Sequence, residues 1–278
     1  MGLKWRVYWR SIVCVLVSLF FSFESIAQQR IKNFQLSNYG KEHRKRWKLV
    51  GEEALIFDNH IEIKRIKANV FSPDSQVEIK AKTAFLDRKN MNVLLKNDVE
   101  VEDKKGMRLV TNSLNWENED NLVSTRDWVQ VKRNSSLKIK AQGFAANLHK
   151  DSAHFDKEVK VTLKNSKKDK EVTIITCDGP LEIDYGKKVA IFKNNVVVTH
   201  PQGKMFSPQV VVYFSKDKKE KIEKIVSKGG VKIVRGDNVA WAEKVTYFDS
   251  EKKIILEGNP RLVVYPFKQG ELKQGNVQ

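Results

Sequence analysis

Alternation of apolar and charged residues at every second position runs through most of this chain and restricts it to β structure. Residues 61–64 read Ile-Glu-Ile-Lys, residues 77–82 read Val-Glu-Ile-Lys-Ala-Lys, and residues 137–140 read Leu-Lys-Ile-Lys. In an extended strand this pattern places apolar side chains on one face of a sheet and charges on the other. No segment shows convincing amphipathic helical spacing, so the sequence predicts an all-β protein.

A short β-branched strand recurs along the chain and defines an internal repeat. It is found at Val99, Val129, Val159, Val196 and Val231, and more weakly at Leu262, with spacings of 30, 30, 37, 35 and 31 residues. Such repeats indicate stacked units that share one core, here an elongated stack of antiparallel strands in repeats of about 30 residues. Two facing layers would enclose an apolar trough, which is an ordinary core at a spacing of about 10 Å and admits a ligand if the layers splay.

The first 27 residues have the layout of an export signal or of a retained membrane anchor. Lys4, Arg6 and Arg10 precede an apolar run over residues 11–23, and residues 25–27 (Ser-Ile-Ala) supply the small side chains of a cleavage site. The run is short for a spanning helix, which favours the signal peptide over the anchor. Residues 28–46 are expected to form a flexible basic linker, and residues 268–278 a polar tail.

The cysteines and the charge constrain the stability and the partners of the chain. Cys14 lies in the N-terminal segment, so Cys177 is left alone and no intramolecular disulfide is expected. The formal net charge is +17, which for an exported protein favours phosphate-bearing lipid or an anionic cell surface over nucleic acid as the partner. Part of the excess is also explained by lysines that solubilise strand faces and protect sheet edges.

Motifs of enzymatic chemistry are missing from the sequence. The five histidines include no His-Glu-x-x-His pair, and there are no zinc-type cysteine pairs, no Gly-x-Ser-x-Gly elbow and no Walker A loop. We therefore expect no catalytic residue, no metal and no cofactor, and any use of ATP would fall to a separate partner. The chain is therefore not expected to be an enzyme.

Several segments resemble proteins of lipopolysaccharide export. Residues 47–54, 106–116, 123–129 and 139–144 are similar to the LptC family, and the resemblance assigns residues 47–170 to an LptC-like β-jelly roll. Residues 175–181, 193–198 and 256–262 resemble the LptA or OstA-like repeat, which assigns residues 171–267 to LptA/OstA-like β repeats. The order and spacing of these diffuse signatures carry the resemblance. The chain differs from the usual pattern because it joins both segments and begins with what reads as a cleavable signal.

The resemblance implies a fold and a function. The fold is an elongated, incompletely closed antiparallel β-jelly roll (OstA-like) whose interior holds lipid acyl chains. The function is that of a non-enzymatic lipopolysaccharide carrier in a periplasmic bridge, either free or anchored to the inner membrane by an uncleaved N-terminal segment. The implied partners are the lipid A acyl chains, inner-membrane ABC exporter components, and other β-jelly-roll bridge proteins joined by end-to-end strand pairing. Strands near residues 49–63 and residues 262–265 are the expected docking ends.

Bulky apolar positions on the long strands are the candidate lipid contacts. They are Leu114, Trp116, Phe144, Leu148, Phe155, Val212, Phe214, Val245 and Tyr247. Side chains of this kind are more often part of an ordinary core than in contact with lipid, because bulky apolar residues are usually buried. Two other functions remain open for the sequence. One is a surface or periplasmic β module that binds anionic polysaccharide, and the other is a structural β-stack without a ligand.

Overall fold

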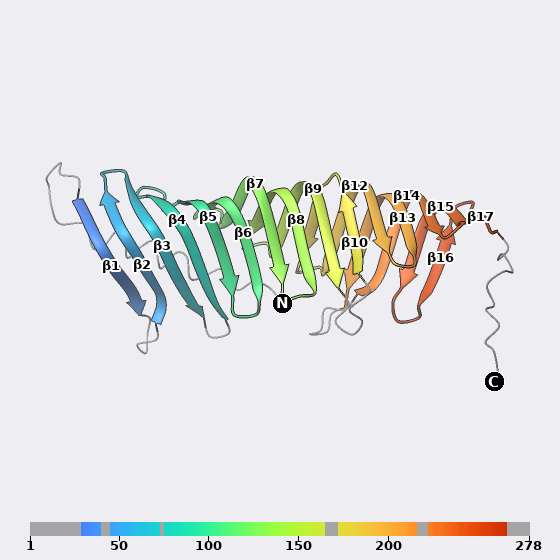
Figure 1. Ribbon diagram of the computed structural model, residues 1–278, viewed down its shortest axis with the longest axis horizontal. Coiled ribbons are helices and arrows are strands. Elements are labelled where there is room, and N and C mark those ends of the chain that lie inside the picture. Colours follow the sequence, from blue (N-terminus) through green and yellow to red (C-terminus); the bar gives the residue numbers. More distant parts are fainter. Residues whose placement is uncertain (1–28, 40–44, 73–74, 165–171, 216–221, 266–278) are drawn as a thin grey trace, which may run out of the picture.

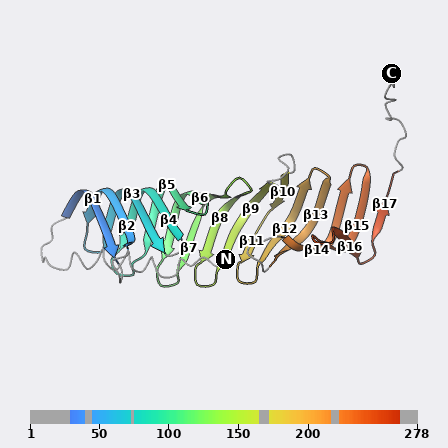
Figure 2. The same ribbon diagram turned by 90° about the horizontal axis from the view of Figure 1, so that it is seen from below.

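The computed structural model describes residues 29–39, 45–72, 75–164, 172–215 and 222–265, which form one antiparallel sheet of 17 strands. Figure 1 and Figure 2 show the strands stacked along the long axis of an elongated molecule. The strands are β1 (Gln29–Tyr39), β2 (Lys45–Ile56), β3 (His60–Ser72), β4 (Ser75–Asp87), β5 (Val93–Asp103), β6 (Met107–Glu117), β7 (Leu122–Arg133), β8 (Leu137–Asn147), β9 (Ser152–Lys164), β10 (Val172–Cys177), β11 (Leu181–Asp184), β12 (Val189–His200), β13 (Gly203–Phe214), β14 (Ile222–Arg235), β15 (Asn238–Phe248), β16 (Lys253–Glu257) and β17 (Arg261–Val263).

Strands that are consecutive in sequence are also neighbours in the sheet, and two positions are filled by pairs of short strands. β10 and β11 both pair with β9 and β12, so they are the two halves of one strand that residues 178–180 interrupt. β16 and β17 both pair with β15 and are interrupted at residues 258–260. β1 pairs with β2 alone, so within the described residues the sheet ends at β1 and at β16–β17 without closing.

Bends near the middle of the strands fold this sheet into two facing layers. The bends contain residues at positive φ, among them Asn97 and Asp98 in β5, Asn194 and Asn195 in β12, and Gly230 in β14. Asparagine, aspartate and glycine adopt this conformation at low cost. Layer A consists of the strand halves that meet at the turns 88–92, 118–121 and 185–188, and layer B of those that meet at the turns 104–106, 134–136 and 201–202.

Each bend interrupts the apolar alternation, and only the strands that return from layer B to layer A change its phase there. Strands that run from layer A to layer B skip from Leu95 to Val99 in β5 and from Phe155 to Val159 in β9. The return strand β8 skips only from Ala141 to Phe144. The ladder registers break at the same places, as at Lys96/Val99 between β5 and β6. The extra residues keep the apolar side chains of both halves pointing into the space between the layers.

The internal repeat found in the sequence marks these bends. Val99, Val129, Val159, Val196 and Val231 each follow a bend directly and have 0–2% of their surface exposed. A small β-branched side chain thus fills the inner side of each of these bends. The predicted all-β stack of antiparallel strands in repeats of about 30 residues is thus confirmed.

Two predictions near the N-terminus are wrong. Residues 29–39 form β1, paired with β2 from Gln29↔Ile56 to Tyr39↔Lys45, where a flexible basic linker over residues 28–46 was expected. The expected docking end near residues 49–63 therefore lies inside the sheet, with β1 covering β2. The alternation was hard to see because Asn33 bends β1 at a φ of 49° and separates Ile31 from the next inward residue, Phe34, by three positions.

No helix within the described ranges is long and apolar enough to cross a membrane. The predicted signal or anchor over residues 1–27 and the predicted tail over residues 268–278 lie outside the described residues.

Candidate functional site

The space between the two layers is lined by cross-strand rows of predominantly apolar side chains. In layer A one such row contains Leu95, Leu114, Phe144, Phe155, Leu181 and Phe192, with the buried Thr125 of β7 between Leu114 and Phe144. In layer B the facing row includes Ile79, Val101, Leu109, Val131, Ile139, Val161 and Ile175. Most members of both rows are under 10% exposed and belong to one hydrophobic cluster that extends from Trp47 to Val212. We call this interior the trough.

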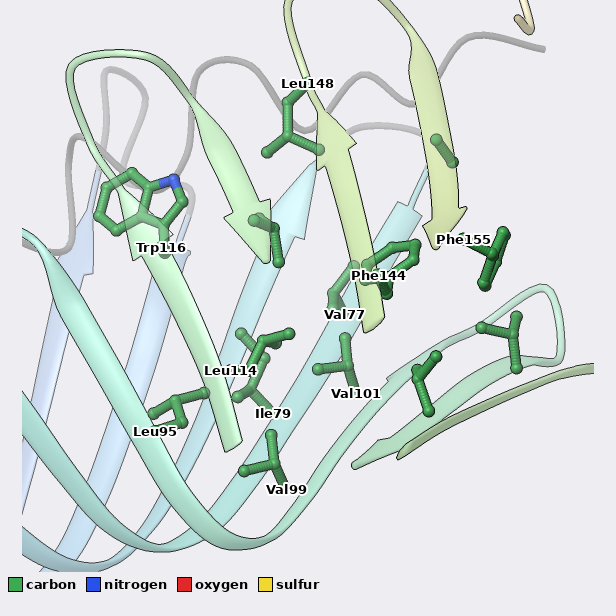
Figure 3. Packing of buried hydrophobic residues seen from close by; sticks show 14 of the residues in the cluster. Val77, Ile79, Leu95, Val99, Val101, Leu114, Trp116, Phe144, Leu148 and Phe155 are labelled. Atoms are coloured by element: carbon green, nitrogen blue, oxygen red, sulfur yellow. The ribbon is translucent and has the colours of Figure 1, made fainter. Parts of the chain in front are cut away.

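The close view of the trough shows how the bends bring both layers onto one core. In Figure 3, Leu95 and Leu114 lie on one side and Val101 on the other, with Val99 where the strand curves beneath the cluster. Phe144 lies against Phe155, with ring centroids 5.1 Å apart and the planes tilted by 48°. Rings and branched aliphatic groups thus fill the middle of the trough with well-packed apolar surface.

The nine side chains predicted from the sequence all lie in layer A. Leu114, Trp116, Phe144, Leu148, Phe155 and Val212 belong to the main cluster, Val245 belongs to a second cluster, and Phe214 and Tyr247 are half-buried. Their burial does not distinguish lipid contact from core packing, so their role stays a prediction. Sequence reasoning missed layer B, whose aliphatic residues are smaller. The short alternating runs at residues 77–82 and 137–140 were the signal that could have identified them.

Partly exposed apolar side chains line both long edges of the trough. On the layer A edge they include Met91, Tyr185 and Phe214, and on the layer B edge Met107, Leu137, Leu163 and Met205. These side chains pack against the core and also reach solvent. The trough therefore has two apolar edges where its contents meet water, and the methionines among them are the most adaptable apolar side chains a protein has.

The two ends of the trough differ. At the N-terminal end β1 covers the core, and Phe34 lies so close to Gly51 that a Cβ there would be 2.6 Å from the ring. At the C-terminal end the second cluster contains only Val231, Ala242 and Val245 as buried members. The inward-facing residues of the last strands, Ile254 and Leu262, are 57% and 61% exposed. We call this exposed end, formed by β16 and β17, the C-terminal opening.

The polar groups of the described residues offer few alternatives to the trough as a functional site. No group of three or more His, Cys, Asp or Glu within the described ranges could hold a metal ion. Cys177 is free and buried, and burial raises the pKa of its thiol. A hollow of about 270 Å³ lies beside Cys177 and Asn195, at the bends of β9, β10 and β12. It is more polar than the trough, so the trough is the dominant candidate site.

Comparison with known families identifies the chain. The trough and its bent strands define a β-jelly roll with an apolar interior, and residues 24–164 match the family model of LptC-related lipopolysaccharide-assembly proteins. Residues 175–277 match the model of LptA and the N-terminal domain of LptD, described as a lipopolysaccharide transport protein. The chain is therefore a lipopolysaccharide transport protein, of a class that is not enzymatic. It belongs to the LptC-related family, with an LptA-like segment after the LptC-like one, as the sequence resemblance predicted.

No curated protein sequence matches the chain. Among solved structures, the chain is similar to LptH of Pseudomonas aeruginosa, the LptA-homologous periplasmic component of a lipopolysaccharide transport device. The identity is 12%, the match covers 68% of this chain and 95% of LptH, and the TM-score is 0.20.

Proposed function

We propose that the chain carries lipopolysaccharide across the periplasm, with the lipid A acyl chains held in the trough and the sugars in water. It forms one segment of a bridge between the membranes, receives lipid from inner-membrane ABC exporter components, and performs no chemistry. The observation that supports this proposal most directly is the predominantly apolar lining from β2 to β12, which a second, smaller apolar cluster follows toward the C-terminal opening. A lining of this length matches a ligand that must move along the protein.

The energetics favour a conduit over free diffusion. Burial of one methylene group contributes about 0.8 kcal/mol, so an acyl chain of a dozen carbons is stabilised by roughly 10 kcal/mol away from water. Passage through water would cost that amount for every chain. Successive apolar rows of similar composition, such as Leu95–Leu114 and Phe144–Phe155, instead offer wells of nearly equal depth. The lipid then moves with small barriers, and a partner supplies the direction.

Entry of the lipid requires the two layers to part along the edges of the trough. The described interior is filled by its own side chains, as Trp116 with 2% exposure illustrates. The half-buried edge residues, including Met91 and Met107, are the ones an incoming acyl chain displaces first. When an acyl chain displaces these side chains, the core loses one apolar contact and gains another. The free-energy cost of lipid entry is therefore mainly the cost of separating the two layers.

Photo-crosslinking tests the proposal with a matched control one residue away. A photo-reactive phenylalanine analogue at Phe144 faces the trough, whereas the same group at the neighbouring Ala145 points to the outer face of layer A. In cells we expect lipopolysaccharide adducts from position 144 and at least about tenfold fewer from position 145, because burial in the trough concentrates the lipid there. Equal yields from both positions, or adducts to protein alone, would favour a structural β-stack without a ligand.

A further inference from the structure

The outer face of layer B carries balanced charges over its N-terminal strands. Glu78 on β4 pairs with Lys67 on β3 at 2.9 Å and also contacts Lys80. Glu100 on β5 pairs with Arg108 on β6 at 2.7 Å. Hydrogen bonds from these basic groups lower the pKa of both glutamates. Acidic and basic side chains therefore neutralise each other across β3–β6.

This balance ends at β7, where lysines face one another across adjacent strands. Lys132 on β7 lies directly opposite Lys138 on β8, and Lys140 on β8 lies directly opposite Lys160 on β9. None of these four lysines forms an ion pair with a described residue. We call them the lysine cluster. Reduced contact with water, and then the positive charges of the neighbouring lysines, lower the pKa of Lys138.

Such an arrangement reduces the stability of the free protein. Like charges directly opposite on adjacent strands destabilise a sheet, whereas opposite charges at the same positions stabilise it. The preceding strands of the same face show that this fold accommodates acidic partners there. An anionic partner outside the molecule would remove the repulsion. The two lysine pairs thus favour a bound state over the free one.

Aromatic side chains on the same outer face add a second, independent observation. Trp128, on the strand that carries Lys132, is 54% exposed, and it points outward beside Gln142. Further along the face, Phe206 and Trp241 lie on either side of Lys232 in one cross-strand row and are 38% and 39% exposed. The Lys232 ammonium lies 6.0 Å from the Trp241 ring. Outward tryptophans between lysines are typical of surfaces that lie at a lipid–water interface.

The composition of this face distinguishes a bilayer from other anionic partners. The two cross-strand rows from β7 to β17 carry lysines, outward aromatics and outward aliphatics such as Ile174 and Val263, and they contain no acidic side chain. A sugar polymer would be recognised by hydrogen-bonding groups at fixed spacing. Adjacent strands are about 4.8 Å apart, so the lysines are instead distributed over a wide surface. Such a surface can contact many separate lipid headgroups at once.

We propose that the outer face of layer B, from the lysine cluster to Trp241, docks the protein onto the surface of a bilayer containing anionic phospholipid. The trough edges then lie beside the membrane, which places them next to a source or acceptor of lipid. This surface is separate from the trough, and the proposal holds whether or not the trough carries lipopolysaccharide.

Vesicle binding by the full chain tests this proposal without lipopolysaccharide. The probe is phosphatidylcholine vesicles with and without added phosphatidylglycerol, and the variant combines Lys138→Gln, Lys140→Gln and Lys160→Gln. Each lysine at an anionic surface contributes a factor of about five in affinity, so we expect the triple variant to bind about 100-fold more weakly to the anionic vesicles. The matched control is Lys89→Gln, Lys150→Gln and Lys187→Gln, which removes the same charge from turns at the layer A edge and should bind like the natural protein.

Fluorescence quenching by brominated lipid locates the contact. Quenching by brominated anionic vesicles should fall in the Trp128→Phe/Trp241→Phe variant relative to the natural protein, because Trp47 and Trp116 are buried and Trp5 and Trp9 are the same in both proteins. Unchanged quenching in that variant, or equal losses of vesicle binding in the two lysine triples, would overturn the proposal. Lysine-dependent binding to a soluble polyanion without binding to vesicles would identify an anionic polymer as the partner instead. Each result can be obtained even if crosslinking from position 144 fails.

Discussion

At the residue scale, glycines at the bends allow backbone conformations and close contacts between strands that a larger residue would prevent. Gly179, between β10 and β11, has a φ of 104°, and a Cβ there would lie 2.1 Å from the Asp156 carbonyl oxygen and 2.7 Å from the Lys157 Cα. Both contacts are with backbone, so no rotamer change relieves them. The position therefore combines a conformation that favours glycine with a close approach of the neighbouring strand.

Substitution of Gly179 by alanine should destabilise the protein strongly. We expect Gly179→Ala to lower the free energy of unfolding by at least about 2 kcal/mol, because backbone strain and overpacking add. Gly230→Ala is the matched control, since Gly230 has a φ of 92° but no atom within 4 Å of the added Cβ. It should cost about 1 kcal/mol from strain alone. Chemical denaturation of the two variants measures the difference, and equal losses would contradict the role of the close contact.

At the element scale, ion pairs between strands fix the outer face of layer B and give stability a dependence on pH. The hydrogen bond from Arg108 is the main reason that the pKa of Glu100 is lowered, and the charges of Arg108 and Lys80 act in the same direction. A folded-state pKa below the unfolded value means that this pair stabilises the protein above the unfolded pKa. That stability is lost as pH falls through the lowered folded pKa.

The variant Glu100→Gln tests this linkage between β5 and β6. We expect it to lower the free energy of unfolding by roughly 0.5–1 kcal/mol at neutral pH, the range for a partly exposed pair. The difference from the natural protein should disappear well below the ordinary glutamate value of 4.5. Denaturation at both pH values measures it, with the exposed turn residue Glu119→Gln as the control. A difference that persists in acid would mean that packing, and not charge, is responsible.

Strands could be predicted from the sequence where their apolar and charged residues alternate without interruption. Residues 77–82 and 137–140 lie within one half of a strand, so their period of two was readable. The bends interrupt that period. A four-residue step such as Leu95 to Val99 keeps the alternation in phase, whereas a three-residue step such as Ala141 to Phe144 makes the alternation of one half predict the wrong face for the other. The bulky residues Trp116, Phe144 and Phe155 were recognised by size, which marks only one of the two layers.

At the scale of the whole molecule, the repeat predicted the stack correctly, and the edges were harder to predict. The sequence of a polar stretch such as residues 29–39 does not show whether it forms one more strand. Such a strand is ordered by pairing with its neighbour, and its own β propensity is too weak to reveal it. β1 is ordered by pairing with β2 and by Phe34 packing over Gly51. The C-terminal end was better predicted, because β17 lies where an edge strand near residues 262–265 was expected.

The asymmetry of the two ends predicts the direction of assembly. β1 covers the core at one end, whereas the C-terminal opening leaves Ile254 and Leu262 exposed at a strand edge that pairs only with β15. Unpaired edges with exposed apolar residues are templates for strand addition, and lysine on an edge prevents it. We therefore expect Ile254→Lys/Leu262→Lys to weaken binding to a purified β-jelly-roll bridge protein by about tenfold or more.

The same double variant should keep the midpoint of thermal unfolding nearly unchanged, since both side chains are more than half exposed in the free chain. Tyr39→Lys on β1, where the natural side chain is 56% exposed, places a charge at the opposite edge and serves as the matched control. Sedimentation of the mixed proteins measures the affinity of each variant. If Tyr39→Lys weakened the complex as much as the C-terminal pair did, the partner would not distinguish the two ends, and the direction inferred from the open end of the trough would be wrong.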